Sequence, residues 1–302
     1  MLLVIEQVLN GLQLGFMLFL LSAGLTLVFG VMNLINLAHG SFYMVGAYVA
    51  ATVMQATGSF LLALLVALGS AALCGLLVEI IVLRHLYQRG HLDQVLATFG
   101  LILFFNEATR MIWGRQPLFM QLPEFLSATV EILPGVPYPL YRLVIIGIGL
   151  LVAIGLFVLI RHTRLGMRIR AGASNREMIA VLGVNIRWLY SLVFALGTML
   201  AGFAGVMAAP LFAVESGMGE SILIPTFVVI VIGGIGSVKG ALLGALLVGL
   251  VDTLARAFLP ALLMWLFATS SANSIAASLA SMGIYLLMAG ILAFKPRGLF
   301  PA

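Results

Sequence analysis

The sequence contains very little charge. Only 8% of its 302 residues are Asp, Glu, Lys or Arg, whereas a typical soluble domain contains about 25%. Because 63% of the residues are hydrophobic, a water-soluble fold of this length would have too few charged side chains to keep its surface solvated. The composition, with a mean hydropathy of +1.21, therefore excludes a soluble globular protein and indicates a chain embedded in a lipid bilayer.

The sequence also lacks the residue patterns of a catalytic or metal-binding protein. A single cysteine, Cys74, excludes an intrachain disulfide. The four histidines are scattered, and neither H-E-x-x-H nor G-x-S-x-G occurs. We expect no enzymatic activity and no bound cofactor. The net charge of +5 comes from arginines in short loops, where they fix membrane orientation, so we expect no nucleic-acid partner.

Apolar runs long enough to cross a bilayer recur along the whole chain. A transmembrane helix needs about 20 apolar residues. The first run is preceded by no Lys or Arg, which argues against a cleaved signal peptide and favours a retained span. The candidate spans lie at roughly 7–30, 41–57, 60–83, 95–113, 142–160, 188–212, 222–238, 240–260 and 275–294.

These runs predict an all-α fold, a polytopic transmembrane helical bundle of eight or nine spans that forms a single domain over residues 1–302. Glycine and other small residues interrupt the stretches 7–57 and 222–260. Non-helical backbone inside a membrane is tolerated where protein surrounds it, so we expect broken or re-entrant helices in both stretches.

The distribution of charge between the spans predicts the orientation. The connection 161–187 carries six arginines against one acidic residue, which is typical of a cytoplasmic loop. The segment 114–141 contains five prolines and two glutamates, a composition that indicates an external loop. Glu6 precedes the first span without a basic neighbour, whereas Lys295 and Arg297 follow the last span. We expect the N-terminus outside and the C-terminus in the cytoplasm.

A polar stretch interrupts the apolar sequence at 33–43. Its polar and small residues recur every three or four positions, so on one helix they share a face. Such groups are costly against lipid and should point into the protein or into a hydrated cavity. Two interpretations remain open, a translocation path or gate and interhelical hydrogen bonding at a helix end. The candidates for the path are Asn33, Asn36, His39, Gly40, Ser41 and Tyr43.

A glycine-rich segment follows the seventh candidate span. It resembles a phosphate-binding loop, but Lys239 is followed by Gly240, where that motif requires Ser or Thr. We interpret it as a tight turn between two close-packed membrane helices, since small residues let helix backbones approach closely in lipid. The residues predicted for this packing are Gly233, Gly234, Gly236, Gly240 and Gly244.

The arginine-rich connection contains a candidate amphipathic helix. Ser174 or Asn175 can cap a helix that begins near Arg176, and Gly183 is a natural stop. Met178, Ile179 and Leu182 supply a short apolar stripe. Such a helix could lie on anionic lipid or dock into a groove of a partner protein.

Three stretches give the chain a family resemblance: GLTLVFGVMNLINLAHGSFYMVGAY at Gly24–Tyr48, TRLGMRIRAGASNREMIAVLGVNI at Thr163–Ile186 and VIGGIGSVKGALLGALLVG at Val231–Gly249. The ending RGLF at Arg297–Phe300 also fits. With these motifs the chain resembles the permease subunits of branched-chain amino acid (LivH-type) ABC importers, over nearly its whole length and in the expected order.

The resemblance implies a role for the amphipathic helix. Permeases of ABC importers carry a cytoplasmic coupling helix with an E-A-A-x-x-x-G pattern that docks into a cleft of the ATPase subunit. Glu177 and Gly183 match that pattern, while Met178 and Ile179 replace the two alanines. The resemblance therefore favours partner docking over lipid binding. The coupling residues it implies are Arg176, Glu177, Met178, Ile179, Leu182 and Gly183.

The resemblance also implies partners and a location. They are a related second permease subunit, two ATP-binding subunits that hold ATP and Mg, and an extracytoplasmic solute-binding protein. The expected location is the cell inner membrane, and the expected solutes are amino acids, above all branched-chain ones. Related permeases serve urea, amides and other small organic solutes, so these remain an alternative.

An ion-coupled secondary transporter is a second alternative from the residues alone. It would need a buried carboxylate within a span to carry protons or hold sodium. Asp252 is the candidate, but Arg256 follows it at i+4, and we expect the two to form an ion pair. Glu107 and Arg110 repeat this pattern at i+3.

Overall fold

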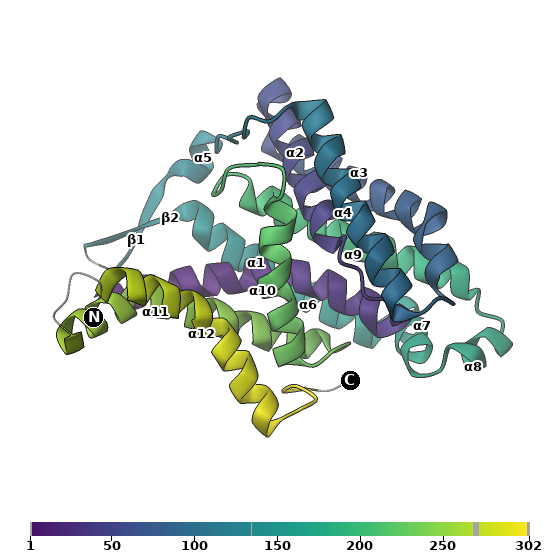
Figure 1. The fold of residues 1–302 in the computed structure, drawn as a ribbon. Helices are drawn as coiled ribbons and strands as arrows, with labels where there is room; N and C mark the ends of the chain where they lie inside the picture. The colour runs from purple at the N-terminus through teal and green to yellow at the C-terminus, as the bar shows by residue number, and fades with distance from the viewer. Residues whose placement is uncertain (1, 134, 268–271, 301–302) are drawn as a thin grey trace.

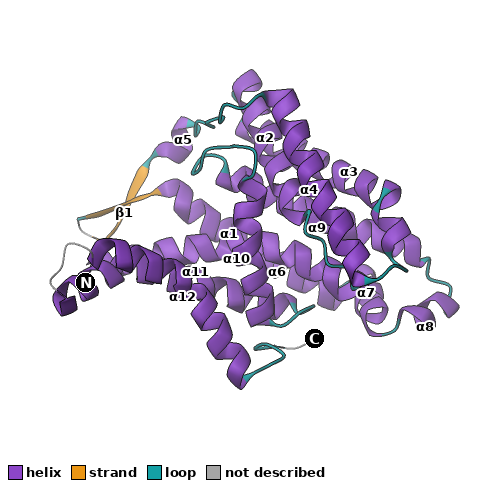
Figure 2. Cartoon of the chain, in the orientation of Figure 1, coloured by secondary structure: helices purple, strands orange, loops and turns teal. Residues whose placement is uncertain are grey.

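The fold was analysed in a computed structural model that describes residues 2–133, 135–267 and 272–300. Most of the described chain is helical (Figure 2), as predicted. The helices are α1 (Leu2–Met32), α2 (His39–Thr57), α3 (Phe60–Ile81), the 3-10 turn η1 (Leu83–Leu86), α4 (His91–Trp113), α5 (Glu124–Ser127), α6 (Leu140–His162), α7 (Arg164–Ser174), α8 (Arg176–Val181), α9 (Ile186–Ala208), α10 (Met218–Gly233), α11 (Val238–Phe267) and α12 (Ala272–Phe294).

The sequence analysis predicted no β-structure. Two short strands, β1 (Thr129–Leu133) and β2 (Val136–Pro139), form an antiparallel hairpin between α5 and α6. The hairpin lies in the proline-rich segment that we expected to be an external loop. Its register pairs Thr129 with Pro139, and an irregularity follows Glu131. Proline cannot donate to a strand ladder, which limits this sheet to a short two-stranded ribbon.

Seven of the described helices are long and apolar enough to cross a membrane, namely α1, α3, α4, α6, α9, α11 and α12. The other two predicted spans correspond to α2 and to α10, which is apolar but has only 16 residues. Eight spans would require one of these two helices to cross as well, and nine would require both, so that number stays a prediction.

Helix α1 runs through the middle of the molecule and packs most extensively against α11 (Figure 1). Glycines make this contact close. A Cβ added at Gly249 of α11 would lie 2.4 Å from the carbonyl oxygen of Gly11 in α1. A Cβ at Gly15 would lie 2.9 Å from the Cα of Leu246. Small residues four positions apart allow such backbone contact, which replaces the hydrophobic effect as the source of helix association in lipid.

A second packed group consists of α2, α3 and α9. A Cβ at Gly46 of α2 would lie 2.5 Å from the Cα of Gly202 in α9, so the two backbones touch. Beside this contact, the Phe42 ring meets Phe194 edge to face, with centroids 5.8 Å apart. Aromatic pairs of this geometry contribute about 0.5–1.5 kcal/mol beyond the area they bury.

The outer helices present large apolar side chains at the surface. Leu65 of α3, Leu103 of α4, Leu151 of α6 and Leu286 of α12 are each more than half exposed. Apolar surface of this extent would be unfavourable in water, whereas lipid solvates it. The arrangement accounts for the low charge content of the sequence.

The two ends of the bundle contain different segments. At one end the β1–β2 hairpin contacts the first turns of α1, where the Tyr138 hydroxyl donates a 3.0 Å hydrogen bond to Asn10. At the other end lie the end of α1, helix α7 and the turn between α10 and α11. The C-terminal segment joins this second end, since the Phe300 amide donates to the Gly233 carbonyl at 2.9 Å.

Candidate functional site

The chain leaves helical geometry for the six residues between α1 and α2. Asn33 has a φ of +51°, in the left-handed region that asparagine tolerates. The Asn36 side-chain oxygen accepts a 3.1 Å hydrogen bond from the amide of Ala38, a local turn that competes with the helix. The prediction that Asn33 and Asn36 share one helical face with Gly40 and Tyr43 is therefore wrong, because these turns break the helix.

The polar side chains at this break differ in burial. Asn33 is exposed, whereas the others point into the protein, as the cost of exposing them to lipid predicts. Asn36 and His39 are fully buried, and Ser41 and Tyr43 are nearly so. Within the described residues, the Asn36 amide nitrogen has no hydrogen-bond partner. Buried polar atoms without hydrogen-bond partners are rare and costly, so this position favours the binding of a polar ligand.

Two of the candidate path residues lie at close helix contacts. A Cβ at Gly40 would lie 2.1 Å from the Gly219 carbonyl oxygen, so α2 and α10 touch here. The Tyr43 carbonyl oxygen lies 2.0 Å from the Cβ position of Gly205 in α9. A larger residue at Gly40 or Gly205 would push these helices apart. Any path along α2 is therefore bordered by helix contacts that leave no room for a larger side chain.

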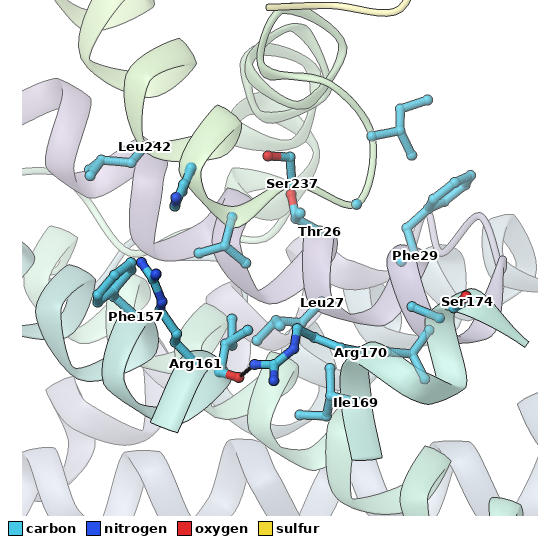
Figure 3. Close-up of a pocket in the computed structure, with 18 of the residues that line it drawn as sticks. Thr26, Leu27, Phe29, Phe157, Arg161, Ile169, Arg170, Ser174, Ser237 and Leu242 are labelled. Atoms are coloured by element: carbon cyan, nitrogen blue, oxygen red, sulfur yellow. Dashed lines mark hydrogen bonds between the residues drawn. The ribbon is translucent and has the colours of Figure 1, made fainter. Parts of the chain in front are cut away.

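A cavity of about 1160 Å³ opens where α1 and α6 end and α11 begins (Figure 3). Asn33 lines it, whereas the buried His39 lies deeper, against Gly24 of α1. The cationic side chains of Arg161, Arg170 and Lys239 also line it. The cavity was not predicted, because it combines residues from four segments far apart in the sequence.

The arginine-rich connection folds into two helices, α7 and α8. Helix α7 is capped by the Thr163 hydroxyl, which accepts from the Gly166 amide at 3.0 Å. Helix α8 is capped by Asn175, whose side chain accepts from the Met178 amide at 2.9 Å. Gly183 follows α8 with a φ of +84°, which glycine adopts without strain. The predicted cap and stop thus appear at the expected residues.

The apolar residues of α8 do not form one stripe. Ile179 is 5% exposed, whereas Met178 is 59% and Leu182 75% exposed. The predicted grouping of these three side chains is wrong because Ile179 turns inward and anchors the helix. Val181, which we did not predict, is exposed on the outer side at 85%. Of the other coupling residues, Glu177 is exposed, and the Arg176 side chain lies outside the described part of the structure.

The glycine-rich segment forms the turn between α10 and α11. Gly234 and Gly236 have φ of +102° and +84° and occupy the turn itself. A Cβ at Gly240 would lie 2.1 Å from the Gly233 carbonyl oxygen, so the two helices touch at these residues. One turn further along α11, a Cβ at Gly244 would lie 2.7 Å from the Val229 carbonyl oxygen.

A buried charged cluster at the end of α3 was missed by the sequence analysis. The Glu79 carboxylate is fully buried and forms a 3.1 Å ion pair with Arg84. It also accepts 2.6 Å hydrogen bonds from the hydroxyls of Tyr87 and Ser191. Burial and the bond to Glu79 raise the pKa of the Tyr87 phenol above its usual range, so the phenol stays a donor. The missed signal was an acidic residue inside an apolar span.

Both ion pairs predicted within the spans are present. Arg256 donates to Asp252 at 2.9 Å in α11. Arg110 contacts Glu107 at 2.6 Å in α4 and also donates to Ser216 at 3.1 Å. These pairs leave neither carboxylate isolated in the interior of the bundle.

Comparison with known proteins agrees with this architecture. Residues 7–292 match the family described as branched-chain amino acid transport system / permease component. The chain is 30% identical to the high-affinity branched-chain amino acid transport system permease protein BraD of Pseudomonas aeruginosa, over 82% of this chain and 85% of that protein. It is 27% identical to the corresponding LivH protein of Escherichia coli, over 84% and 87% of the two chains.

A more distant similarity links the chain to the ribose import permease protein RbsC of Escherichia coli, with 27% identity over 77% of this chain and 72% of that protein. No solved structure matches. Together with the seven membrane-length helices among the described residues, the match over almost the full sequence shows a multi-pass membrane protein. The chain belongs to the branched-chain amino acid transport system permease family.

Proposed function

We propose that this chain is the permease subunit of an ATP-driven importer and forms the membrane path for branched-chain amino acids. The relatives that support this solute are named for branched-chain amino acid transport. Because a ribose permease is also among the relatives, other small polar solutes, including urea and amides, are the alternative. The chain itself would carry no catalytic activity, and ATP and Mg would bind to partner subunits.

The observation that carries this proposal is the exposed apolar face of α8. Met178 and Val181 of this six-residue helix, which is too short to span a membrane, and Leu182 directly after it are each more than half exposed. Exposed apolar side chains on such a helix favour a protein partner that covers them. Ile179 is buried on the inner side of the helix, and α8 packs against α7 and α9, so force applied to α8 would reach the bundle. This is what a coupling helix requires.

Trp188 of α9 extends the apolar face toward the bundle. The Trp188 side chain is 55% exposed, and with Leu182, Gly183 and Arg168 it lines a small cavity of about 320 Å³. Aromatic and arginine side chains are enriched at protein interfaces. We infer that an ATP-binding subunit covers Met178, Val181 and Leu182 and contacts this cavity.

The orientation follows from the same region. The end of the bundle that contains α7 and α8 is rich in arginine, and cytoplasmic loops are rich in Lys and Arg. We infer that this end faces the cytoplasm and that the β1–β2 hairpin faces outward. The C-terminal segment then lies inside and the N-terminus outside, in the cell inner membrane.

We infer that the solute path follows the break between α1 and α2. The Asn36 and His39 side chains are buried here, the Asn36 amide nitrogen has no partner in the described residues, and the surrounding helices contact one another at glycines. Closely packed helices with two alternative arrangements would let the path open to one side at a time. A related second permease, two ATP-binding subunits and an extracytoplasmic solute-binding protein would complete the importer.

Copurification tests the proposal. The tagged full chain is purified in mild detergent from cells that express the whole transport system, and bound proteins are identified by mass spectrometry. We expect ATP-binding subunits with the wild type and their loss with Met178→Asp/Leu182→Asp. Phe125→Asp, at a 69% exposed side chain of α5, is the matched control and should retain them.

Uptake of labelled leucine, urea and ribose by the reconstituted complex identifies the solute class. If the Met178→Asp/Leu182→Asp variant kept both its ATP-binding subunits and its uptake, coupling through α8 would be wrong. If the subunits copurified but only urea or ribose were transported, that result would support an ATP-driven importer and would contradict branched-chain amino acids as its solute.

A further inference from the structure

We propose that the cavity at the end of α1 is a binding site for the headgroup of an anionic phospholipid. The site borders the break between α1 and α2 at Asn33, but the proposal does not depend on which solute is transported. It rests on the proposed orientation in one respect, because that orientation makes the lipid one of the cytoplasmic leaflet.

The cavity concentrates positive charge. Arg161 of α6 and Lys239 of α11 both lie over the face of the Phe157 ring, 5.5 and 5.7 Å from its centroid. Arg170 of α7 reaches the same space and donates to the Ile160 carbonyl. Among the described residues, no Asp or Glu lines the cavity or pairs with these three cations. Like charges gathered without a counterion favour an anionic ligand.

The opposite wall adds neutral donors. Figure 3 shows Thr26 of α1 and Ser237 beside the space that Arg161 and Arg170 enter. The Thr26 hydroxyl is fully buried and has no partner in the described residues. The first turn of α11, a helix of 30 residues, borders the same space, so its positive dipole end lies beside the cavity; the Gly240 amide of this turn donates to the Ser237 hydroxyl at 3.1 Å. Cations, a buried hydroxyl and a helix N-terminus together form an anion site.

The size and the walls of the cavity favour a lipid over a small free anion. Its volume of about 1160 Å³ far exceeds what a phosphate ion or a single amino acid would fill. Phe157 lines the cavity and is also 38% exposed on the outer face of α6. Leu151 and Ile154 continue that exposed face. A phospholipid could therefore place its phosphate in the cavity and lay its acyl chains along α6.

The site adjoins the coupling segment. Ser174, the last residue of α7, lines the cavity and directly precedes Asn175, which caps α8. A headgroup bound by Arg170 would hold α7 against α1 and α6. The lipid would thereby fix the base from which α8 projects.

Native mass spectrometry of the purified full chain with added lipids tests the site. We expect phosphatidylglycerol to bind at least tenfold more tightly than phosphatidylcholine with the same acyl chains. Arg161→Gln/Lys239→Gln should remove that preference, since each cation contributes roughly fivefold. Thr26→Val, which keeps the charge, should weaken phosphatidylglycerol binding severalfold. The charge-matched control Lys295→Gln/Arg297→Gln, at exposed residues outside the cavity, should bind as the wild type does.

Three outcomes would overturn the proposal. The first is equal binding of the two lipids by the wild type. The second is an unchanged preference in the Arg161→Gln/Lys239→Gln variant, with retained phosphatidylcholine binding as the check on folding. The third is displacement of phosphatidylglycerol by inorganic phosphate or leucine at millimolar concentration, which would assign the cavity to a free anion. If the double variant fails to fold, the single variants Thr26→Val and Lys239→Gln replace it. Binding of phosphatidylglycerol and phosphatidylcholine is then compared for each of them.

Discussion

The Ser191 hydroxyl of α9 donates a 2.6 Å hydrogen bond to the Glu79 carboxylate at the end of α3. Ser191 lies in the second turn of α9, the helix that follows α8 after a short connection. Arg84 completes the cluster by contacting both side chains, at 3.1 Å to Glu79 and 3.0 Å to Ser191. A movement of α8 would therefore reach α3 directly through polar contacts.

Replacing Glu79 should destabilise the fold. Glu79→Ala leaves Arg84, Tyr87 and Ser191 without their common acceptor. Losing one member of a buried ion pair costs about 3–5 kcal/mol, and the lower end applies because the Arg84 side chain is 33% exposed. The measurement is denaturant-induced unfolding in detergent, followed by alkylation of Cys74.

Glu124→Ala, at an exposed glutamate of α5, is the control and should change the unfolding free energy by less than about 0.5 kcal/mol. Equal stability of Glu79→Ala and the control would show that the cluster contributes nothing to folding.

Tyr87→Phe should cost less and should show a defined pH dependence. The phenol donates 2.6 Å to a carboxylate, a bond that contributes about 1.5–3 kcal/mol. Burial raises the pKa of the phenol in the folded state. Its contribution is therefore fully present below the unfolded pKa of about 10 and is lost as the pH rises above that value. The stability difference from wild type should be the same at pH 6 and pH 8.5, and a decline between these values would contradict the assigned donor.

Much of the fold could be predicted from the sequence because lipid imposes a simple rule on it. Apolar runs at 60–83 and 275–294 correspond to α3 and α12 within a few residues. The break between α1 and α2 could be placed only within a wide stretch, since local turns at Asn33 and Asn36 ended a helix that periodicity alone would continue.

The sites were less predictable than the spans. Helix α8 has six residues, and apolar side chains lie on both of its faces, so the pattern could not tell the buried Ile179 from the exposed Met178. Glu79 and Ser191 are 112 residues apart in the sequence, and their pairing depends on how α3 and α9 cross. Such contacts depend on tertiary packing, which spacing does not encode.

The contact between Gly233 and Gly240 predicts a sharp response to a single methyl group. In Gly240→Ala, the new Cβ would lie 2.1 Å from the Gly233 carbonyl oxygen, so α10 and α11 must move apart. Overpacking against backbone costs about 1–3 kcal/mol. Gly155→Ala in α6 is the matched control, because its Cβ meets nothing within 4 Å. The control should be neutral or slightly stabilising in the same unfolding assay, and an equal loss in both variants would refute the close contact.

The two neighbours Met178 and Ile179 should separate folding from coupling. Ile179→Asp buries a charge and should lower the stability of the chain by several kcal/mol, with release of α8. Met178→Asp, at an exposed side chain, should leave stability within about 0.5 kcal/mol of wild type while weakening the hold on ATP-binding subunits. Thermal unfolding and copurification are measured on the same preparations. Identical effects of the two variants in both assays would mean that α8 has no distinct inner and outer face.

The ion pair in α11 distinguishes an ATP-driven importer from an ion-coupled transporter. The Asp252 carboxylate contacts Arg256 at 2.9 Å, and the Arg256 side chain is 56% exposed, so the pair contributes at most about 1 kcal/mol. Asp252→Asn should therefore leave solute uptake by the reconstituted complex within about twofold of wild type. Uptake should stop on ATP depletion and should continue in the presence of an uncoupler.

Glu107→Gln, which removes an equivalent pair in α4, is the control. Loss of uptake in Asp252→Asn alone, together with sensitivity to the uncoupler at constant ATP, would make Asp252 an ion carrier, because an isolated titratable carboxylate within a span is what such coupling requires.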